Sequence, residues 1–344
     1  MVAQLQSRRH VVDDVGTAIE FCYDQGWTDG LPVVPPTESR VAEFVEAMRC
    51  APDTVVGEIP QRARTVTAEK VAINAVMAGC LPSYAPVVRA AIEALCDPLH
   101  NVNGSAASTG GSAPLVIVTG PIAHKLGMNG KGNLLGPASR ANATIGRAVR
   151  LVLMNVGGAT VGVMDKSTIG HAGKYTYCVT EDDESRPWLP FHAQRGVPAE
   201  ASAVTVFAAE GSRQVDNHFS NTAEGILWSI AGAMTPRARN AGGCFGVILC
   251  PEHAAVIGRD GWGERQVREY LAANARMTIA ELKRFGRIGG EIGSGDDRQW
   301  VSTVKEADDI LLLVGGGNAG GFSAVIPPWA GGPGSLPVTK LVQE

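Results

Sequence analysis

Three short apolar runs constrain the fold of this chain more than any other feature. Residues 115–118, 245–249 and 310–314 contain aliphatic, aromatic or glycine residues and no polar side chain that could face water. Such runs are typical of strands that are buried on both faces of a sheet covered by helices. The first two runs lead through a proline into a helical pattern, and the third leads into a glycine-rich stretch.

Strand-like and helix-like patterns alternate through most of the sequence. Strands are expected at residues 54–59, 115–118, 161–164, 175–180, 204–208, 245–249 and 310–314. Helices are expected to begin near residues 13 and 37 and to cover residues 67–78, 85–95, 138–155, 222–234, 251–258, 265–275 and 279–285. This alternation predicts an α/β fold of mostly parallel sheets flanked by helices.

The length of 344 residues allows a large core, which we expect to be divided between two intimately packed lobes. A flexible tail is expected at residues 1–12. The N-terminal α/β lobe would cover residues 13–200 and carry a glycine-rich ligand loop, and the C-terminal α/β lobe would cover residues 201–344.

A faint internal repeat accompanies this division. The tripeptide Thr-Ala-Glu at residues 67–69 recurs at residues 222–224, and the passage from strand through proline to helix at 116–121 recurs at 247–251. A duplication would explain both matches. A chance similarity between common α/β patterns would explain them equally well.

Charge and cysteine usage exclude several classes of protein. The net charge of -4 argues against nucleic acid as a partner. No stretch reaches the roughly 18 apolar residues of a membrane span, and the polar first ten residues lack the apolar segment of a signal peptide. The seven cysteines are widely spaced without a C-x-x-C pair, so no metal site and no other cofactor is predicted. We expect a cytoplasmic protein with reduced thiols.

The stretch from residue 126 to residue 178 is the richest in small, amide and cationic side chains beside glycines. Asn129 and Asn133 lie in a glycine-rich loop, and Arg140, Asn142 and Arg147 lie near the start of the helix after it. Glycines let the backbone approach a ligand, and guanidinium groups suit carboxylate or phosphate. These residues are predicted to bind a small anion, although no nucleotide motif is present. A structural turn with surface arginines is the alternative.

The run at residues 173–178 alternates as a strand would. Lys174 and Cys178 would then share one face, and Tyr177 would lie on the other as a substrate-binding residue. A lysine near a thiol can lower the thiol pKa, so Lys174 and Cys178 are candidate catalytic residues. His171 could act as the base only if the turn folds back. An ordinary strand with a buried cysteine is the alternative.

Three further segments supply candidate binding or catalytic groups. Lys70 and Asn74 are four residues apart and share one face of a helix. Glu210, Asn217 and His218 follow an apolar strand, where ligands often bind in parallel sheets. His218 is the preferred general acid or base among the seven histidines. A metal site formed by Asp216, His218 and His171 lacks any ligand spacing, and His124 and His253 are expected to be structural.

Gly316 and Asn318 lie in the glycine-rich stretch after the last apolar run. Backbone N–H groups in such a stretch can form a nest for an oxyanion or a carboxylate. Both residues are therefore predicted to bind substrate. A flexible turn is the alternative.

Four segments resemble the long proteins of the UGSC (seleno)protein family. They are WTDGLPVVPPT at residues 27–37, EKVAINAVMAGC at 69–80, RANATIGR at 140–147 and GKYTYC at 173–178. The resemblance covers most of the chain, but the Sec/Cys-Gly-Ser-Cys motif that names the family is absent. It implies a substrate-binding protein that receives thiol or selenol chemistry from a small redox partner.

These observations favour an enzyme, or the substrate-binding subunit of one, that acts on a small polar or anionic molecule. The expected reaction is thiol-linked cleavage or formation of a carbon–heteroatom bond by a lyase or a reductase. A non-catalytic scaffold subunit of a redox complex is one alternative, and a cofactor-free hydrolase or hydratase is another. A homo- or hetero-oligomer is expected.

Overall fold

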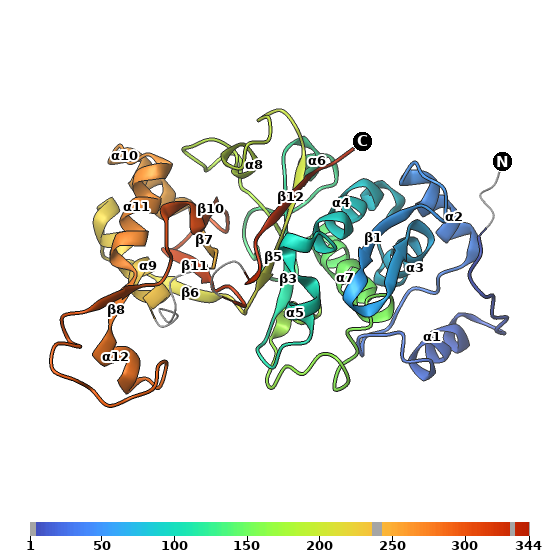
Figure 1. The fold of residues 1–344 in the computed structure, drawn as a ribbon. Helices are drawn as coiled ribbons and strands as arrows, with labels where there is room; N and C mark the ends of the chain where they lie inside the picture. Colours follow the sequence, from blue (N-terminus) through green and yellow to red (C-terminus); the bar gives the residue numbers. More distant parts are fainter. Residues whose placement is uncertain (1–4, 236–242, 331–333, 344) are drawn as a thin grey trace.

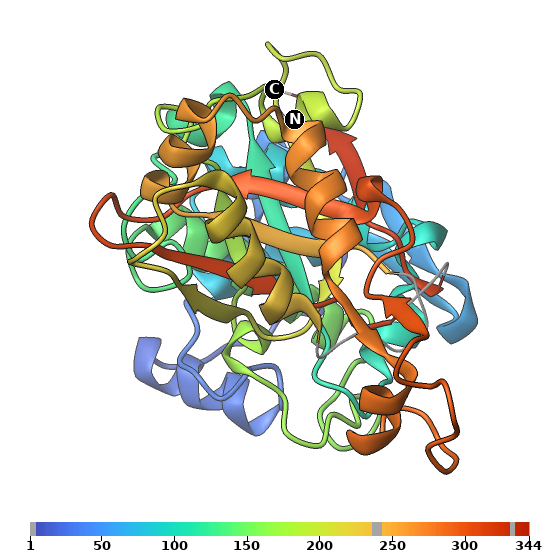
Figure 2. The same ribbon diagram turned by 90° about the vertical axis from the view of Figure 1, so that its left-hand side faces the viewer.

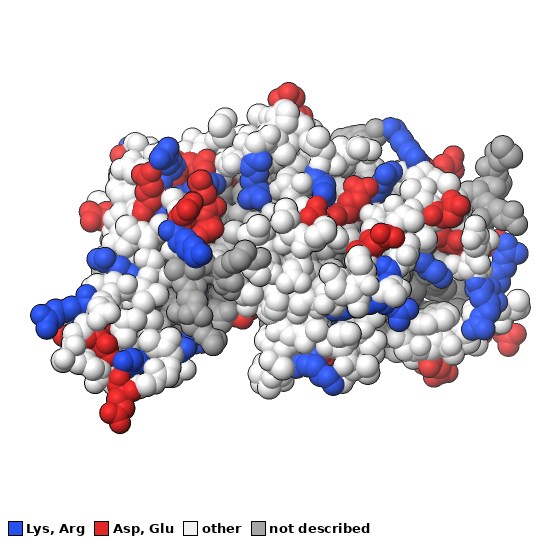
Figure 3. Space-filling view, viewed as in Figure 1, with Lys and Arg blue, Asp and Glu red and all other residues white. Residues whose placement is uncertain are grey.

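Two four-stranded sheets are stacked face to face between two layers of helices (Figure 1). The computed structural model describes residues 5–235, 243–330 and 334–343, so the first four residues of the predicted tail lie outside the described ranges. Turned by 90°, the molecule presents its second helix layer in front of the strands (Figure 2). Acidic and basic side chains are interspersed on the face in Figure 3, which shows no large patch of one sign.

The first sheet joins strands from distant parts of the chain. Its order is β12 (Val338–Leu341), β5 (Ala203–Ala209), β3 (Ala113–Thr119) and β4 (Cys178–Thr180). Strand β3 runs parallel to β4 and antiparallel to β5, and β12 is antiparallel to β5. Its outer face is covered by α3 (Ala68–Ala78), α4 (Ala85–Leu95) and α7 (Arg140–Asn155).

The second sheet has the order β10 (Ile310–Val314), β7 (Phe245–Leu249), β11 (Phe322–Ile326) and β6 (Arg213–Asp216). Strands β10 and β7 are parallel, whereas β11 is antiparallel to both β7 and β6. The helices on its outer face are α9 (Ala223–Met234), α10 (Pro251–Arg259) and α11 (Glu264–Asn274).

The remaining elements are peripheral or short. The N-terminal helices are α1 (Val15–Asp24) and α2 (Glu38–Ala47), followed by a hairpin of β1 (Val55–Ile59) and β2 (Arg64–Thr67). Short helices connect the layers: α5 (Val102–Ala106), α6 (Pro121–Lys125) and α8 (Phe191–Gln194). A second hairpin and a helix extend from the second sheet: β8 (Arg276–Thr278), β9 (Trp300–Ser302) and α12 (Ile279–Arg284).

Alternate residues of the central strands face different cores. In β3, Val116 and Val118 face the first helix layer, while Leu115 and Ile117 face the second sheet. Strand β10 divides in the same way between the second helix layer and the space between the sheets. This double burial explains the uninterrupted apolar runs, because neither face of these strands meets water.

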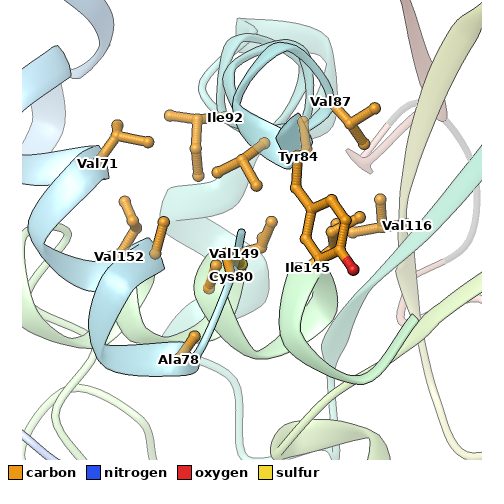
Figure 4. Close-up of a cluster of buried hydrophobic side chains, with 14 of the residues drawn as sticks. Val71, Ala78, Cys80, Tyr84, Val87, Ile92, Val116, Ile145, Val149 and Val152 are labelled. Atoms are coloured by element: carbon orange, nitrogen blue, oxygen red, sulfur yellow. The ribbon is translucent and has the colours of Figure 1, made fainter. Parts of the chain in front are cut away.

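The first helix layer forms a dense aliphatic core over β3 (Figure 4). Val71 of α3, Ile92 of α4 and Val149 of α7 are fully buried there. Helix α3 begins where Thr67 Oγ1 accepts the Lys70 N–H, as the sequence predicts for this N-cap. The three helices therefore hold one face of the first sheet rigidly.

The predicted α/β class is confirmed in its coarse form, but the prediction of mostly parallel sheets is wrong. Only β3–β4 and β7–β10 are parallel pairs within the two described sheets. Residues 161–164 form a turn rather than a strand, and the strand expected at 175–180 begins only at Cys178. The antiparallel strands β6, β11 and β12 were not expected, and they make the sheets mixed.

The two sheets share one pattern of strand directions. From β12 to β4, and from β6 to β10, successive pairs are antiparallel, antiparallel and parallel. The pattern supports an internal duplication. However, β5 and β12 complete the sheet of β3 and β4, so the strands do not separate at the predicted boundary between residues 200 and 201.

Removing a side chain between the sheets should destabilise the whole molecule. We expect Ile117→Ala to lower the free energy of unfolding by about 2–5 kcal/mol, because a cavity would open where Ile117 is 1% exposed. Urea unfolding monitored by circular dichroism measures this. Val163→Ala is the matched control, since Val163 is 73% exposed and should change stability by less than about 0.5 kcal/mol. Equal effects of the two substitutions would contradict the stacked arrangement.

Candidate active site

Strand register brings four separate segments to one edge of the second sheet, by which we mean the side where β7 and β10 end. Strands β7 and β10 are parallel, so Cys250 and Gly315 follow them at the same edge. Ala324 of β11 pairs with Ile248, which places Ser323 beside the end of β7. Phe322 pairs with Asp216 at the end of β6, so Asn217 reaches the same edge.

The side chain of His253 connects these segments. It projects from the first turn of α10, where its Nε2 lies 3.0 Å from the Asn217 carbonyl oxygen and its Nδ1 lies 2.7 Å from Ser323 Oγ. A carbonyl oxygen only accepts hydrogen bonds, so Nε2 must carry a hydrogen. In the neutral ring, Nδ1 is then the basic nitrogen.

Cys250 is the N-cap residue of α10, three residues before His253, and its thiol interacts with the imidazole. Its backbone N–H donates to Ser323 Oγ at 3.1 Å, so the hydroxyl hydrogen of Ser323 is free to point toward His253 Nδ1. The side chains of Cys250, His253 and Ser323 are nearly fully buried. The three therefore form a closed thiol–imidazole–hydroxyl cluster, which we call the Cys250 cluster.

The surroundings of Cys250 lower the pKa of its thiol. Burial would raise the pKa of the Cys250 thiol, but hydrogen bonds from the side chain and backbone N–H of His253 outweigh it, and the net shift is downward. Burial would lower the pKa of His253, yet hydrogen bonding to Cys250 and to the Asn217 carbonyl raises it overall. The N-terminus of α10 also stabilises negative charge on the sulfur.

A glycine is required where the backbone passes His253. A Cβ atom at Gly321 would lie 2.8 Å from His253 Nε2 and would collide with the Asn217 carbonyl oxygen. Asn217 N–H donates to the Gly321 carbonyl at 2.9 Å, which fixes the two segments together. The imidazole is therefore held by close backbone packing on one side and by Ser323 on the other.

The predicted nest at residues 315–318 is not available as expected. The Gly315 N–H donates to the Leu249 carbonyl, and the Gly316 N–H donates to the Gly130 carbonyl, each at 2.9 Å. These contacts tie the second sheet to the loop of Asn129 and Asn133, so Gly316 contributes structure rather than a free donor. Asn318 stays exposed at this edge, as does Asn133.

Asn129 and Asn142 satisfy each other instead of facing a ligand. The Asn129 N–H donates to Asn142 Oδ1 at 2.9 Å, and Asn142 Nδ2 donates to the Asn129 carbonyl at 3.1 Å. Asn142 is buried, and its Nδ2 also approaches the Cys178 carbonyl. The pair anchors the glycine-rich loop to α7, so these amide groups are engaged within the protein.

The two predicted anion-binding arginines are also engaged within the protein. Both Nε and one terminal nitrogen of Arg140 donate to the Gly79 carbonyl at 3.0 and 2.9 Å. Arg147 binds Asp29 through two hydrogen bonds of 2.8 and 2.7 Å. Each guanidinium therefore fixes an N-terminal segment to α7. These hydrogen bonds are made within the protein and not to a substrate.

Lys174 is saturated with structural contacts. Its Nζ lies 2.8 Å from Asp165 Oδ2 and donates to Ser167 Oγ and the Ser112 carbonyl at 2.9 and 3.0 Å. An ammonium group has three hydrogens, so these acceptors use all of them. Asp165 also pairs with buried Arg150 at 2.9 Å. The predicted catalytic role of Lys174 is therefore not supported.

Cys178 lies away from Lys174 and under α7. Lys174 belongs to a 3-10 turn and not to β4, so the two side chains do not share a strand face. Burial raises the pKa of the Cys178 thiol far above its ordinary value. A protonated buried thiol is a poor nucleophile, and the alternative of a packed cysteine is the better description.

Tyr177 and Glu210 meet at the opposite end of the strands from the Cys250 cluster. The Tyr177 hydroxyl donates to the Glu210 carbonyl at 3.3 Å, and the Tyr177 ring packs 5.6 Å from the ring of His171. A Cβ atom at Gly211, two residues after the end of β5, would lie 3.3 Å from His171 Cβ, so His171 lies beside this end of the strand. His171 is thus separated from Asp216 and His218 by the length of the sheet.

Asn217 and His218 lie at the candidate edge, with roles that differ from those expected. The Asn217 side chain donates to Ser220, Gly225 and Ser229, so only its carbonyl oxygen serves the cluster. His218 is exposed, accepts the Gly321 N–H at 3.4 Å and packs 4.7 Å from the Phe322 ring. His253, which was expected to be structural, is the histidine whose ring contacts Ser323 and interacts with the Cys250 thiol.

Lys70 and Asn74 lie in the other helix layer, on the far side of both sheets. Asn74 is buried, and its Oδ1 accepts from Asn155 at 2.7 Å, so it holds α3 to α7. Lys70 lies at the border of a separate cavity beside the N-terminal segment. Neither residue can act together with the Cys250 cluster.

Sequence reasoning missed Cys250, His253 and Ser323. The available signal was Cys-Pro-Glu-His at residues 250–253, a cysteine between a buried strand and a helix with a histidine three residues later. That spacing places the imidazole over the N-cap residue. Ser323 had no local signal, because its contact depends on the pairing of β11 with β7.

Comparisons with known proteins add no further assignment. No family model, no curated protein and no solved structure matches the chain. Within the described residues, no three or more His, Cys, Asp and Glu side chains are grouped so that they could hold a metal ion. No helix in the same ranges is both long and apolar enough to cross a membrane.

Glu181 is a buried carboxyl near the same edge. The neighbouring Asp182 N–H donates to the Val314 carbonyl at 2.9 Å, and the Phe191 N–H donates to Glu181 Oε2 at 3.0 Å. Burial raises the pKa of Glu181 to about 7, although the bond from Phe191 opposes this shift. The folded state therefore holds the neutral acid more readily than the unfolded chain does.

This raised pKa predicts a pH-dependent stability. Because the pKa of Glu181 is higher in the folded state, its carboxyl does not lower the free energy of unfolding through ionisation below about pH 4.5. As the pH rises from there toward 7, ionisation of Glu181 lowers the free energy of unfolding progressively. Glu181→Gln should therefore stabilise the protein at pH 8 more than at pH 5, by about 2–3 kcal/mol. Urea unfolding at both pH values measures the difference. Exposed Glu184→Gln is the control, and equal effects of Glu181→Gln at the two pH values would contradict the assignment.

Proposed function

We propose that this protein is a thiol-dependent enzyme that cleaves or forms a carbon–heteroatom bond in a small polar or anionic molecule. The observation that carries the proposal is the Cys250 cluster. Cys250 is the nucleophile in place of Cys178, and His253 is the acid–base group in place of His218. Asn133 and Asn318 are the proposed substrate-binding residues. Both are exposed, on loops that are joined by a bridge between Lys131 and Gly316.

The contacts of His253 define the proton path in this proposal. The Cys250 thiol transfers its proton to Nδ1, while Nε2–H keeps its bond to the Asn217 carbonyl. The thiolate attacks an electrophilic carbon, a carbon–sulfur bond forms, and the carbon–heteroatom bond breaks. The imidazolium returns its proton from Nδ1 to the departing heteroatom. Water or a thiol from a partner then gives its proton to Nδ1 and replaces Cys250 at the carbon. The carbon–sulfur bond breaks, and the proton on Nδ1 returns to the released sulfur, which restores the Cys250 thiol.

Access to the cluster requires the loops above it to separate. Cys250 is only 1% exposed, and the segment of Gly320 and Gly321 packs between His253 and the exposed His218 ring. Exposed Phe322 flanks the same place. In this proposal, a small substrate enters when the loops at residues 217–219 and 317–320 part. Closure then excludes water from the thiolate.

The alternative functions receive less support from the geometry. A hydrolase that uses His218 and a glycine nest lacks the free N–H groups of Gly315 and Gly316, which bind carbonyl oxygens. A non-catalytic scaffold would not need a thiol whose pKa is lowered in a buried site. A small thiol or selenol redox protein, as the UGSC resemblance implies, is the proposed partner of the enzyme.

Thiol reactivity tests the proposal directly. Alkylation of Cys250 by iodoacetamide should have its pH midpoint below that of an ordinary thiol, because His253 stabilises the thiolate. In His253→Gln the midpoint should move upward by about one pH unit or more, since glutamine keeps a donor for the Asn217 carbonyl but has no basic nitrogen. Peptide mass spectrometry measures each cysteine separately across the pH range.

Two controls separate reactivity from access. The labelling rate of Cys250 at high pH should be equal in both proteins, because every thiol is then ionised and only loop opening limits the rate. Cys178→Ser should leave the profile of Cys250 unchanged. An unshifted midpoint in a folded His253→Gln variant would refute the thiolate–imidazolium pair and with it the proposed function.

A further inference from the structure

The N-terminal segment borders a large, partly open cavity on the side of the molecule that the Cys250 cluster does not use. This N-terminal cavity has a volume of about 1100 Å³ and lies between residues 5–15, α1 and the outer surface of α3. Protein interiors contain few voids larger than a water molecule, whereas ligand pockets commonly reach several hundred Å³. The cavity therefore has the size of a ligand site.

A buried carboxylate holds the segment in place over the cavity. Glu69, in the first turn of α3, is 4% exposed and accepts the N–H groups of Gln6 and Ser7 at 2.9 and 2.7 Å. Burial would raise the pKa of Glu69, but these hydrogen bonds lower it overall, so the charged form is retained. The segment is thus fixed at one point.

Helix α1 closes the cavity from the other side. It stands apart from the other helices in Figure 1, below α3. Its Phe21 ring packs against Trp27 at 5.7 Å and against His10 at 4.9 Å. These ring contacts join α1 to the fixed segment and leave a space between α1 and α3 that no described side chain fills.

The walls and the border of the cavity differ in character. The walls are apolar and include Phe21, Val41, Ile73, Met77 and Val156. The border carries charges of both signs, among them the cations Arg8, Arg64 and Lys70.

The described residues offer these cations no carboxylate within ion-pair distance, although Lys70 Nζ donates to Ser7 Oγ at 3.1 Å. The acidic groups of the border are committed elsewhere. Glu38 pairs with Arg9, Glu69 binds backbone N–H groups, and Asp14 accepts from Thr17.

We propose that the N-terminal cavity binds an amphipathic organic anion, with its apolar body between α1 and α3 and its anionic head at Arg8, Arg64 and Lys70. The apolar walls supply the area for burial, and the cations select the sign of the head group. Lys70, expected from the sequence to bind substrate, belongs to this second site. The site is separate from the proposed thiol chemistry, and its ligand need not be the substrate.

Fluorescence of 8-anilinonaphthalene-1-sulfonate, an aromatic anion, tests the site in the full chain. The wild-type protein should bind the probe saturably, and the double variant Arg64→Gln/Lys70→Gln should bind it about tenfold or more weakly. Arg265→Gln/Arg298→Gln is the matched control, because it removes the same charge from exposed positions outside the cavity. It should bind the probe as the wild type does.

Two further measurements decide between occupants. Octanoate should displace the probe at concentrations where uncharged 1-octanol does not, and Ile73→Trp, which fills the cavity, should abolish saturable binding. Unchanged binding in the charge variant and in Ile73→Trp would overturn the proposal. It would also be overturned if the cavity joins two copies of this chain. In that case, sedimentation would show a dimer that Ile73→Trp dissociates and that excludes the probe.

Discussion

The packing of the two sheets against each other determines where chemistry can occur in this molecule. The space between them is filled by aliphatic and aromatic side chains such as Ile117, Phe207 and Leu313. Both outer faces are covered by helices, so the central strands have no polar surface. Functional groups can therefore lie only at the strand ends or outside the helix layers. The Cys250 cluster occupies the first kind of place, and the N-terminal cavity occupies the second.

Burial also determines what His253 can do. An unpaired buried polar group costs about 1–3 kcal/mol, and both nitrogens of the buried His253 ring have partners. The Asn217 carbonyl accepts the Nε2 hydrogen, Ser323 Oγ contacts Nδ1, and the ring also interacts with the Cys250 thiol. One contact thereby fixes the tautomer, and the other leaves a basic nitrogen beside a thiol. The need to pair buried polar groups has the opposite result for Lys174. Its three hydrogens are all used by acceptors within the protein, so none is left for a substrate.

The sequence predicts the fully buried helices and strands far better than strands such as β6 that lie at the side of a sheet. Residues 85–95, 245–249 and 310–314 match α4, β7 and β10, because continuous apolar patterns survive in any tertiary context. Strand β6 carries a single apolar residue, Val215, and its formation depends on pairing with β11. The candidate site is equally hard to predict from the sequence, because it also depends on the pairing of distant strands. Ser323 is 70 residues from His253, so only the antiparallel pairing of β11 with β7 brings them together.

The comparison of the two sheets shows why only one edge can carry the thiol. Strand β3 leads through Gly120 and Pro121 into α6 as β7 leads through Cys250 and Pro251 into α10, and each helix carries a histidine. A Cβ at Gly120 would collide with the Ala201 carbonyl oxygen, so no cysteine fits there. His124 is exposed and pairs with Asp183, whereas His253 is buried against Asn217. If the sheets arose by duplication, backbone packing closed one edge and left the other to hold the Cys250 cluster.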